Sequence, residues 1–262
     1  MLVDINAYVG HWPFKQLRYN TCTELIERMD HFGVDISVVN NLNGIFYKNT
    51  QSANEELYNE LQSDTRYVQR LIPFAVINPI YAGWRDDFGA SIDTLGMKGI
   101  RLYPKYHDYA LTDTACIDLV KLARDSNLPV AFSFRMVDSR QRSWLDIEEE
   151  WDLNDIVPIV REVPDARYIF LNLTNSTELD EEDEMLLRKA DILIDTSGRS
   201  VNDFIPLLDR FGVNKFAFGT HSPILDYLTG LLRIESLNED EASREVKDQL
   251  RSGNALEFLR LT

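Results

Sequence analysis

The stretch Gly-Ile-Arg-Leu-Tyr-Pro-Lys-Tyr-His-Asp-Tyr, residues 99–109, combines a short strand with a cluster of polar side chains near the middle of the chain. Ile100 and Leu102 alternate with Arg101 and Tyr103, as in a strand, and the proline that follows prevents further ladder pairing. A strand that ends among arginine, tyrosine and histidine suggests a functional site. The alternative is an edge strand that leads into a solvated turn.

Length and composition are those of an ordinary folded protein. The chain has 262 residues, of which 44% are hydrophobic and 27% are charged. Barrels of the α/β type commonly reach this length as one domain, and we predict one domain over residues 1–262. No targeting segment and no membrane span are visible, so we expect a cytoplasmic protein. Cys22 and Cys116 are too isolated for a disulfide framework or a thiolate metal site.

The formal net charge of -16 argues against two classes of partner. Nucleic acids and anionic membranes both attract clustered Lys and Arg, so we expect the protein to bind neither. A pocket lined by cations would be a local exception in so acidic a chain. Aromatic residues such as Trp12 and Trp151 are compatible with a pocket or with a homo-oligomer contact, and the sequence leaves the oligomeric state open.

Strand-like and helix-like patterns alternate to the end of the chain. Eight strands are predicted, at residues 2–6, 35–40, 71–77, 100–103, 129–134, 167–172, 191–195 and 215–219. Helical periodicity predicts the segments between them, at residues 21–33, 52–61, 91–95, 113–123, 151–163, 177–190 and 201–211, and a helical, acidic remainder from residue 224.

These elements favour a (β/α)8 TIM barrel with C-terminal helices. Each strand is followed by a helix or a long loop, which fits a barrel better than an open sheet. A dinucleotide-binding fold would need a Gly-rich phosphate loop after the first strand, and none is present there.

Functional groups of such a barrel lie where its strands end. In this chain those positions are unusually polar, and they comprise Asn6, Tyr8, Asn40, Asn78, Arg101, Tyr103, His107, Ser133, Arg135, Asp138, Arg140, Asn172, Asp195, Ser197, Thr220 and His221. Each residue alone has an ordinary explanation in a turn or on the surface. Their recurrence at strand after strand favours a site.

Several short motifs occur in an order and spacing that cover nearly the whole chain. They are Asp-x-Asn-x-Tyr at residues 4–8, Gly-Ile-Arg-Leu-Tyr-Pro at 99–104, Asn172 at a strand end, Phe-Gly-Thr-His-Ser-Pro at 218–223 and Gly-Asn-Ala at 253–255. Together they resemble the amidohydrolase superfamily, and more closely the amidohydrolase-related branch that includes small-acid decarboxylases and hydrolases. The resemblance implies a metal-dependent hydrolase or decarboxylase whose barrel holds one or two divalent ions, usually zinc.

The positions that the resemblance assigns to metal ligands hold other residues. The His-x-His of the first strand is replaced by Asn6 and Tyr8, the histidines of the fifth and sixth strands by residues near Ser133 and by Asn172, and the aspartate of the eighth by His221. Asn, Tyr and Ser are poor zinc ligands. We therefore predict that the usual metal site is missing and that no cofactor binds, although zinc or another divalent metal stays compatible with the resemblance.

A rearranged metal site is an alternative. His31 falls in the first helix and is expected to be structural, whereas His11, His107 and His221 could together supply three imidazole ligands. Their loops differ from the ligand positions that the resemblance implies.

The remaining residues predict a pocket for a small carboxylate. Guanidinium groups bind carboxylates through paired donors, and the predicted substrate-binding residues are Asn6, Tyr8, Arg101, Tyr103, Arg135, Arg140 and Asn172. Alternatively, Arg135 and Arg140 pair with Asp138 and Asp195 and merely hold loops. In catalysis without metal, His107 or His221 would be the general acid or base, with Asp138 or Asp195 orienting it.

Three functions stay open on the sequence alone. The first is an amidohydrolase-type hydrolase or lyase that acts on a small carboxylated compound. The second is a non-catalytic barrel that binds an acidic metabolite through its arginines, and the third is a structural or regulatory subunit.

Overall fold

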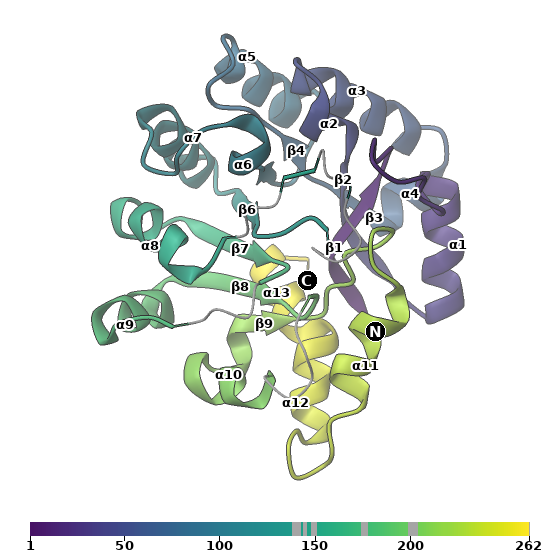
Figure 1. Cartoon of the computed structure of the whole chain (residues 1–262). Helices are drawn as coiled ribbons and strands as arrows, with labels where there is room; N and C mark the ends of the chain where they lie inside the picture. Colours follow the sequence, from purple (N-terminus) through teal and green to yellow (C-terminus); the bar gives the residue numbers. More distant parts are fainter. Residues whose placement is uncertain (138–142, 144–145, 148–150, 174–177, 199–203, 262) are drawn as a thin grey trace.

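The computed structural model describes residues 1–137, 143, 146–147, 151–173, 178–198 and 204–261 (Figure 1). All paired strands are parallel, in two sheets with the orders β1-β2-β3 and β4-β5-β6-β7-β8-β9. Their bounds are β1 Val3–Val9, β2 Ile36–Asn41, β3 Leu71–Pro73, β4 Ala75–Val76, β5 Ile100–Leu102, β6 Pro129–Ser133, β7 Arg167–Leu171, β8 Asp191–Asp195 and β9 Phe216–Ala217.

The two sheets are joined on both sides, so the strands form one barrel. The single predicted strand at 71–77 is interrupted at Phe74, whose N–H donates to the carbonyl oxygen of Val39 at 2.8 Å. On the other side, the N–H of Ile5 donates to the carbonyl oxygen of Phe218 at 3.0 Å. The architecture is the predicted (β/α)8 barrel.

Helices surround the strands (Figure 1). Their bounds are α1 Cys22–Phe32, α2 Asn43–Phe46, α3 Thr50–Leu61, α4 Thr65–Arg70, α5 Trp84–Gly89, α6 Pro104–His107, α7 Thr114–Asp125, α8 Leu153–Glu162, α9 Glu181–Lys189, α10 Phe204–Phe211, α11 Tyr227–Glu235, α12 Arg244–Asp248 and α13 Asn254–Leu259. Shorter turns are Ala90–Thr94 and Gln249–Gly253, which are π-helical, and Val213–Lys215. Within the described residues, no helix has the length and apolar character needed to cross a bilayer.

Local signals explain where several helices begin and end. Thr21 and Glu24 form a capping box at the start of α1, and Gly33 ends this helix with a left-handed φ of 68°. The helix predicted at 151–163 is observed as α8, and Pro158 lies inside it, beyond its first turn. Proline lacks an N–H, so the carbonyl of Asn154 loses its usual helical partner. Another helix was predicted at 201–211, and it corresponds to α10. The first three predicted residues, 201–203, lie outside the described residues.

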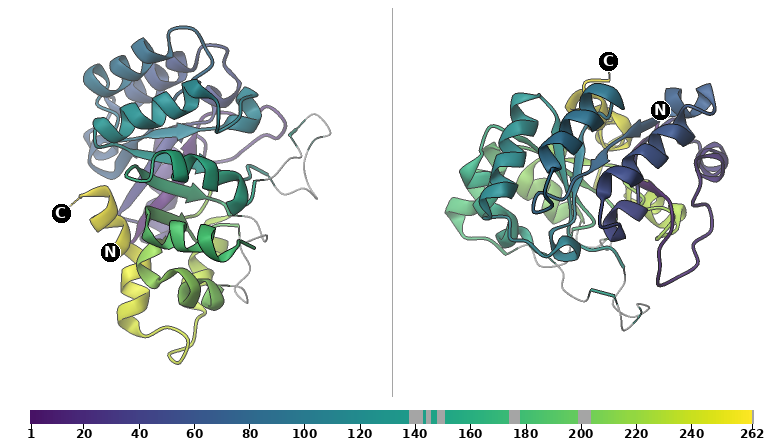
Figure 2. Two further views of the ribbon diagram at one scale, coloured as in Figure 1. Left: turned by 90° about the vertical axis from the view of Figure 1, so that its left-hand side faces the viewer. Right: turned by 90° about the horizontal axis from the view of Figure 1, so that it is seen from above.

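The lower half of the barrel interior is apolar. Inward side chains from successive strands pack there, and they include Val3, Ile5, Val38, Phe74, Ala131, Ile169, Leu171, Leu193 and Ala217. Ala255 of α13 is buried against them, so this helix closes the amino-terminal end of the barrel, where both chain termini lie (Figure 2). Any site must therefore open at the carboxyl-terminal end, which we call the mouth.

A β-bulge in β1 decides which side chains reach the mouth. Asp4 pairs with Ser37 but Ala7 pairs with Val39, so β1 contains one residue more than β2 between these pairs. Below the bulge the odd-numbered residues of β1 point inward; above it, the apolar Ala7 packs in the outer core beneath the helices. The even-numbered residues after the bulge consequently face the interior.

Candidate functional site

Arg101 lies at the centre of the mouth, with 1% of its surface exposed. Its Nε donates to Ser133 Oγ at 3.0 Å, and its Nη1 donates to Asn40 Oδ1 at 2.9 Å. Its Nη2 donates to Asn6 Oδ1 at 2.8 Å and to the hydroxyl of Tyr8. The guanidinium has five N–H groups in all. Most of its donors therefore bind the protein itself.

The aromatic rings beside Arg101 also contact it. Its guanidinium carbon lies 4.1 Å from the ring centroid of Tyr8 and 5.6 Å from that of Tyr103, so both rings are placed for cation–π contact. The hydroxyl of Tyr103 accepts a hydrogen bond from Asn40 Nδ2 at 2.7 Å. Burial raises the pKa of both tyrosines, so both hydroxyls stay protonated.

Asp195 lies beside this cation but contacts it through an amide. Its Oδ2 accepts hydrogen bonds from Asn6 Nδ2 at 2.6 Å and from Ser197 Oγ, and its Oδ1 accepts from the backbone N–H of Asn172 at 2.7 Å. Complete burial raises the pKa of Asp195, and these three hydrogen bonds and the charge of Arg101 partly oppose the shift.

His221 is fully buried and held in one tautomer. Its Nε2 lies 2.7 Å from the carbonyl oxygen of Met136, so this nitrogen carries the proton. Its Nδ1 then accepts from Tyr8 Oη at 3.2 Å and from Asn6 Nδ2 at 3.3 Å. Burial lowers the pKa of His221 to about 3, and the imidazole is neutral near pH 7.

Arg135 and Asn172 lie at the edge of the same cluster. The half-buried Arg135 donates from Nη2 to the carbonyl oxygen of Gly198 at 3.1 Å and to Asn172 Oδ1 at 3.4 Å. Asn172 Nδ2 donates in return to the carbonyl oxygen of Arg135 at 2.8 Å. These contacts hold the ends of β6 and β7 together beside Asp195.

His107 lies apart from this cluster. It is on α6, where its Nε2 contacts the carbonyl oxygen of Gly44 at 3.3 Å, and among the residues that the structure describes its buried Nδ1 has no hydrogen-bond partner. Burial lowers its pKa to about 4. The structure thus brings seven of the predicted residues together, namely Asn6, Tyr8, Arg101, Tyr103, Asn172, Asp195 and His221, with Arg135 at their edge. Asp138 and Arg140 lie outside the described residues.

Apolar side chains cover the polar cluster from above. The cap is formed by Trp12, Leu42, Ile45, Val76 and Met136, packed on the rings of Tyr8 and Tyr103. The side chains of Asn6, Tyr8, Arg101, Tyr103, Asn172, Asp195 and His221 are almost fully buried, whereas Ser133 and Arg135 are half-buried. In this conformation the centre of the cluster is shielded from water and its edge at Arg135 is not.

Sequence reasoning missed Asp4, whose carboxylate holds the backbone of Asn6 and Thr220 in place next to the cluster. Asp4 Oδ2 accepts from Thr220 Oγ1 at 2.6 Å, and its Oδ1 accepts from the backbone N–H groups of Thr220 and Asn6 at 3.0 and 2.9 Å. Burial raises the pKa of Asp4 to about 6. The Asp-x-Asn motif itself was the available signal, because a charged residue in a strand of buried residues needs a partner.

The residues at the mouth do not fit the divalent metal that the resemblance implies. Within the described part of the chain, no group of three or more His, Cys, Asp or Glu side chains is arranged to hold an ion. The histidines are separated, since His11 is exposed, His107 contacts α2 and His221 contacts Met136. Two of the positions assigned to ligands, Asn6 and Tyr8, instead accept hydrogen bonds from a guanidinium, as does Ser133 near a third.

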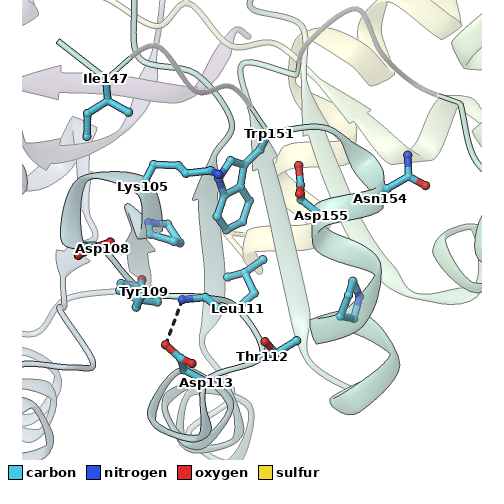
Figure 3. Close-up of a pocket in the computed structure, with 13 residues that line it drawn as sticks. Lys105, Asp108, Tyr109, Leu111, Thr112, Asp113, Ile147, Trp151, Asn154 and Asp155 are labelled. Atoms are coloured by element: carbon cyan, nitrogen blue, oxygen red, sulfur yellow. Dashed lines mark hydrogen bonds between the residues drawn. The ribbon is translucent and has the colours of Figure 1, made fainter.

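A cavity of about 990 Å³ lies beside the barrel, between α6, α7 and the start of α8 (Figure 3). Lys105, Asp108 and Trp151 are among its lining residues, and the Lys105 ammonium lies 5.8 Å from the ring centroid of Trp151. None of the residues of the Arg101 cluster lines this cavity.

Comparison with known proteins shows similarity in structure but not in sequence. No protein-family model matches the chain, and no curated protein sequence matches it. Among solved structures, 5-carboxyvanillate decarboxylase from Sphingomonas paucimobilis is 13% identical with a TM-score of 0.73, covering 100% of this chain and 99% of that one. A proposed amidohydrolase from Staphylococcus aureus is 16% identical with a TM-score of 0.71, covering 99% of each chain.

A third similar structure carries a metal ion. Dihydroxybenzoic acid decarboxylase from Polaromonas sp. JS666, with bound manganese and the inhibitor 2-nitroresorcinol, is 11% identical with a TM-score of 0.73, covering 99% of this chain and 97% of that one. The resemblance predicted from the sequence motifs is confirmed at the level of the fold. This chain has the barrel of these decarboxylases and of the proposed amidohydrolase from end to end.

Proposed function

We propose that this protein is an amidohydrolase-like lyase or hydrolase that acts on a small carboxylated compound with a rearranged site in place of the usual metal centre. The observation that carries the proposal is the coupled pair of charges at the mouth, in which Asn6 links Arg101 to Asp195. Similar barrels in the comparisons are decarboxylases of carboxylated aromatic compounds. A carboxylate ligand would complement the cationic side of this cluster.

The proposed roles differ from those expected at first. Arg135, which is half-buried at the edge of the cluster, is the candidate for binding the carboxylate. Asp195 is the candidate for proton transfer, because burial shifts its pKa towards neutrality. The low pKa values of His107 and His221 make either imidazole a weak base near pH 7.

A non-catalytic binding barrel is the second candidate. It is supported by the low pKa values of His107 and His221, which leave both imidazoles weak bases near pH 7. Because most Arg101 donors already bind the protein, Arg135 would hold the acid in this candidate as well. Such a protein would hold an acidic metabolite without converting it.

One experiment separates the two candidates. The purified chain is titrated by calorimetry with a panel of hydroxybenzoates and short-chain carboxylic acids, and each ligand that binds is then followed for release of carbon dioxide or hydrolysis. Turnover that persists after treatment with a chelator supports the enzyme, and binding without turnover supports the carrier. Absence of binding, or binding unchanged in Arg135→Ala, would contradict the anion site itself.

A further inference from the structure

The guanidinium of Arg101 is surrounded by acceptors from several strands, in the way that protein ligands surround a bound metal ion. Its four hydrogen-bond acceptors come from three other strands, with Asn6 and Tyr8 on β1, Asn40 on β2 and Ser133 on β6. Each of these acceptors is an uncharged oxygen. The side chain enters from β5 and ends at the point on which these strands converge.

This point is where the resemblance would place a divalent ion. Two of the positions assigned to metal ligands, Asn6 and Tyr8, bind the guanidinium directly, and so does Ser133, which lies near a third. His221, at a further assigned position, contacts both Asn6 and Tyr8 through Nδ1. We propose that the Arg101 guanidinium is the built-in cation of this barrel and takes the central place of a metal ion.

The chemistry of the surrounding groups fits a monovalent organic cation. Neutral amide and hydroxyl oxygens suit the spread-out charge and fixed donor directions of a guanidinium, whereas zinc prefers imidazole, thiolate or carboxylate. The compensating negative charge of Asp195 lies one amide away, because Asn6 accepts from Arg101 and donates to Asp195. Arg101 is thus a positioning residue, which fixes Asn6 and through it the Asp195 carboxylate.

This inference does not depend on the proposed function. A barrel built around Arg101 can be an enzyme or a carrier. The experiments below therefore measure cation binding at the centre of the mouth and not turnover.

Chemical rescue tests the inference directly. Arg101→Ala leaves a space lined by the same four acceptors, and we expect its melting temperature to fall by roughly 10 °C. Millimolar guanidinium chloride should restore a large part of this loss, and equal concentrations of sodium or methylammonium chloride should not. Arg85→Ala, which removes an exposed arginine paired with Asp118, is the control and should show no gain. A folded Arg101→Ala protein without rescue would overturn the proposal.

A second measurement uses the unmutated chain and so does not depend on the variant folding. In a ¹⁵N-labelled sample, the hydrogen-bonded guanidinium of Arg101 should give separate, slowly exchanging Nη signals, unlike exposed arginines. Added Mn²⁺ should leave these signals and those of Tyr8 and Asn6 sharp. Selective broadening of this set by Mn²⁺ would show that a metal ion binds at the centre, and would refute the proposal.

Discussion

The side chain of Asn6 lies 2.6 Å from the carboxylate of Asp195, with Nδ2 donating to Oδ2, although 189 residues separate the two in sequence. The other end of the same amide accepts from Arg101. One neutral side chain therefore connects a buried cation to a buried anion. Its removal would leave both charges without their link in a region of low dielectric.

Replacing this amide is expected to be costly. Asn6→Leu keeps a similar volume but removes both hydrogen bonds, and we expect the free energy of unfolding to fall by about 3 to 5 kcal/mol. Urea denaturation measures the change. Asn254→Leu is the matched control, since Asn254 is a buried asparagine that donates to two neutral groups, the carbonyl oxygens of Val213 and Phe216. Equal losses of unfolding free energy in the two variants would show that linking Arg101 to Asp195 stabilises the protein no more than an ordinary buried asparagine does.

The hydroxyl of Tyr8 is expected to stabilise the cluster separately from its ring. Tyr8→Phe keeps the ring beneath Arg101 but removes the oxygen that accepts from Arg101 and contacts His221. We expect a loss of about 1 to 3 kcal/mol in denaturant unfolding. Tyr168→Phe, whose buried hydroxyl donates to the carbonyl oxygen of Val163 at 2.7 Å, is the comparison. A Tyr8→Phe protein as stable as the parent would argue that the hydroxyl is not an acceptor of the guanidinium.

Acidification should destabilise the protein through His107. Its pKa is lowered from 6.5 to about 4 by burial, so the unfolded chain takes up a proton in this range before the folded chain does. The contribution to stability is therefore present above pH 6.5 and is lost as the pH falls towards 4, by about 3 kcal/mol in all. His107→Phe should remove this part of the pH dependence of urea unfolding. His31→Phe, on the exposed side of α1, is the control. An unchanged pH dependence in His107→Phe would mean that His107 is solvated.

Asp4 should act with the opposite sign. Burial raises its pKa from 3.8 to about 6, so the folded chain holds this proton more tightly than the unfolded chain. Its contribution is complete below pH 3.8 and is lost as the pH rises through 6, by about 3 kcal/mol. In Asp4→Asn, stability should fall less between pH 4 and pH 7 than in the parent. The difference between the two unfolding curves at each pH gives the measurement, and a constant difference would contradict the shift.

The sequence predicted the fold well because periodicity and chain breaks are local signals. Pro104 ended β5 where expected, and the helix predicted at 21–33 is observed as α1, Cys22–Phe32. The first strand was predicted too short, because Tyr8 and Val9 continue the ladder by pairing with Asn40 and Asn41. That pairing depends on a distant segment and is invisible in residues 2–9 alone.

The role of Arg101 was harder to predict, and the reason is geometric. The sequence shows an arginine at a strand end, which could face a ligand or the protein. The choice depends on acceptors from strands that are 32 to 95 residues away, and on their register. The separation of His107 from His221 likewise follows from the short helix α6, which directs His107 towards α2.

The extra residue in β1 makes the chemistry of the mouth depend on backbone length as well as on side-chain identity. Deleting Ile5 or Asn6 would remove the bulge while Ala7 and Tyr8 kept their pairing with Val39 and Asn40. The strand would then lose either an apolar side chain of the core or the amide that links Arg101 to Asp195. The bulge therefore allows two consecutive residues of one strand to serve two different layers, the apolar core and the polar mouth.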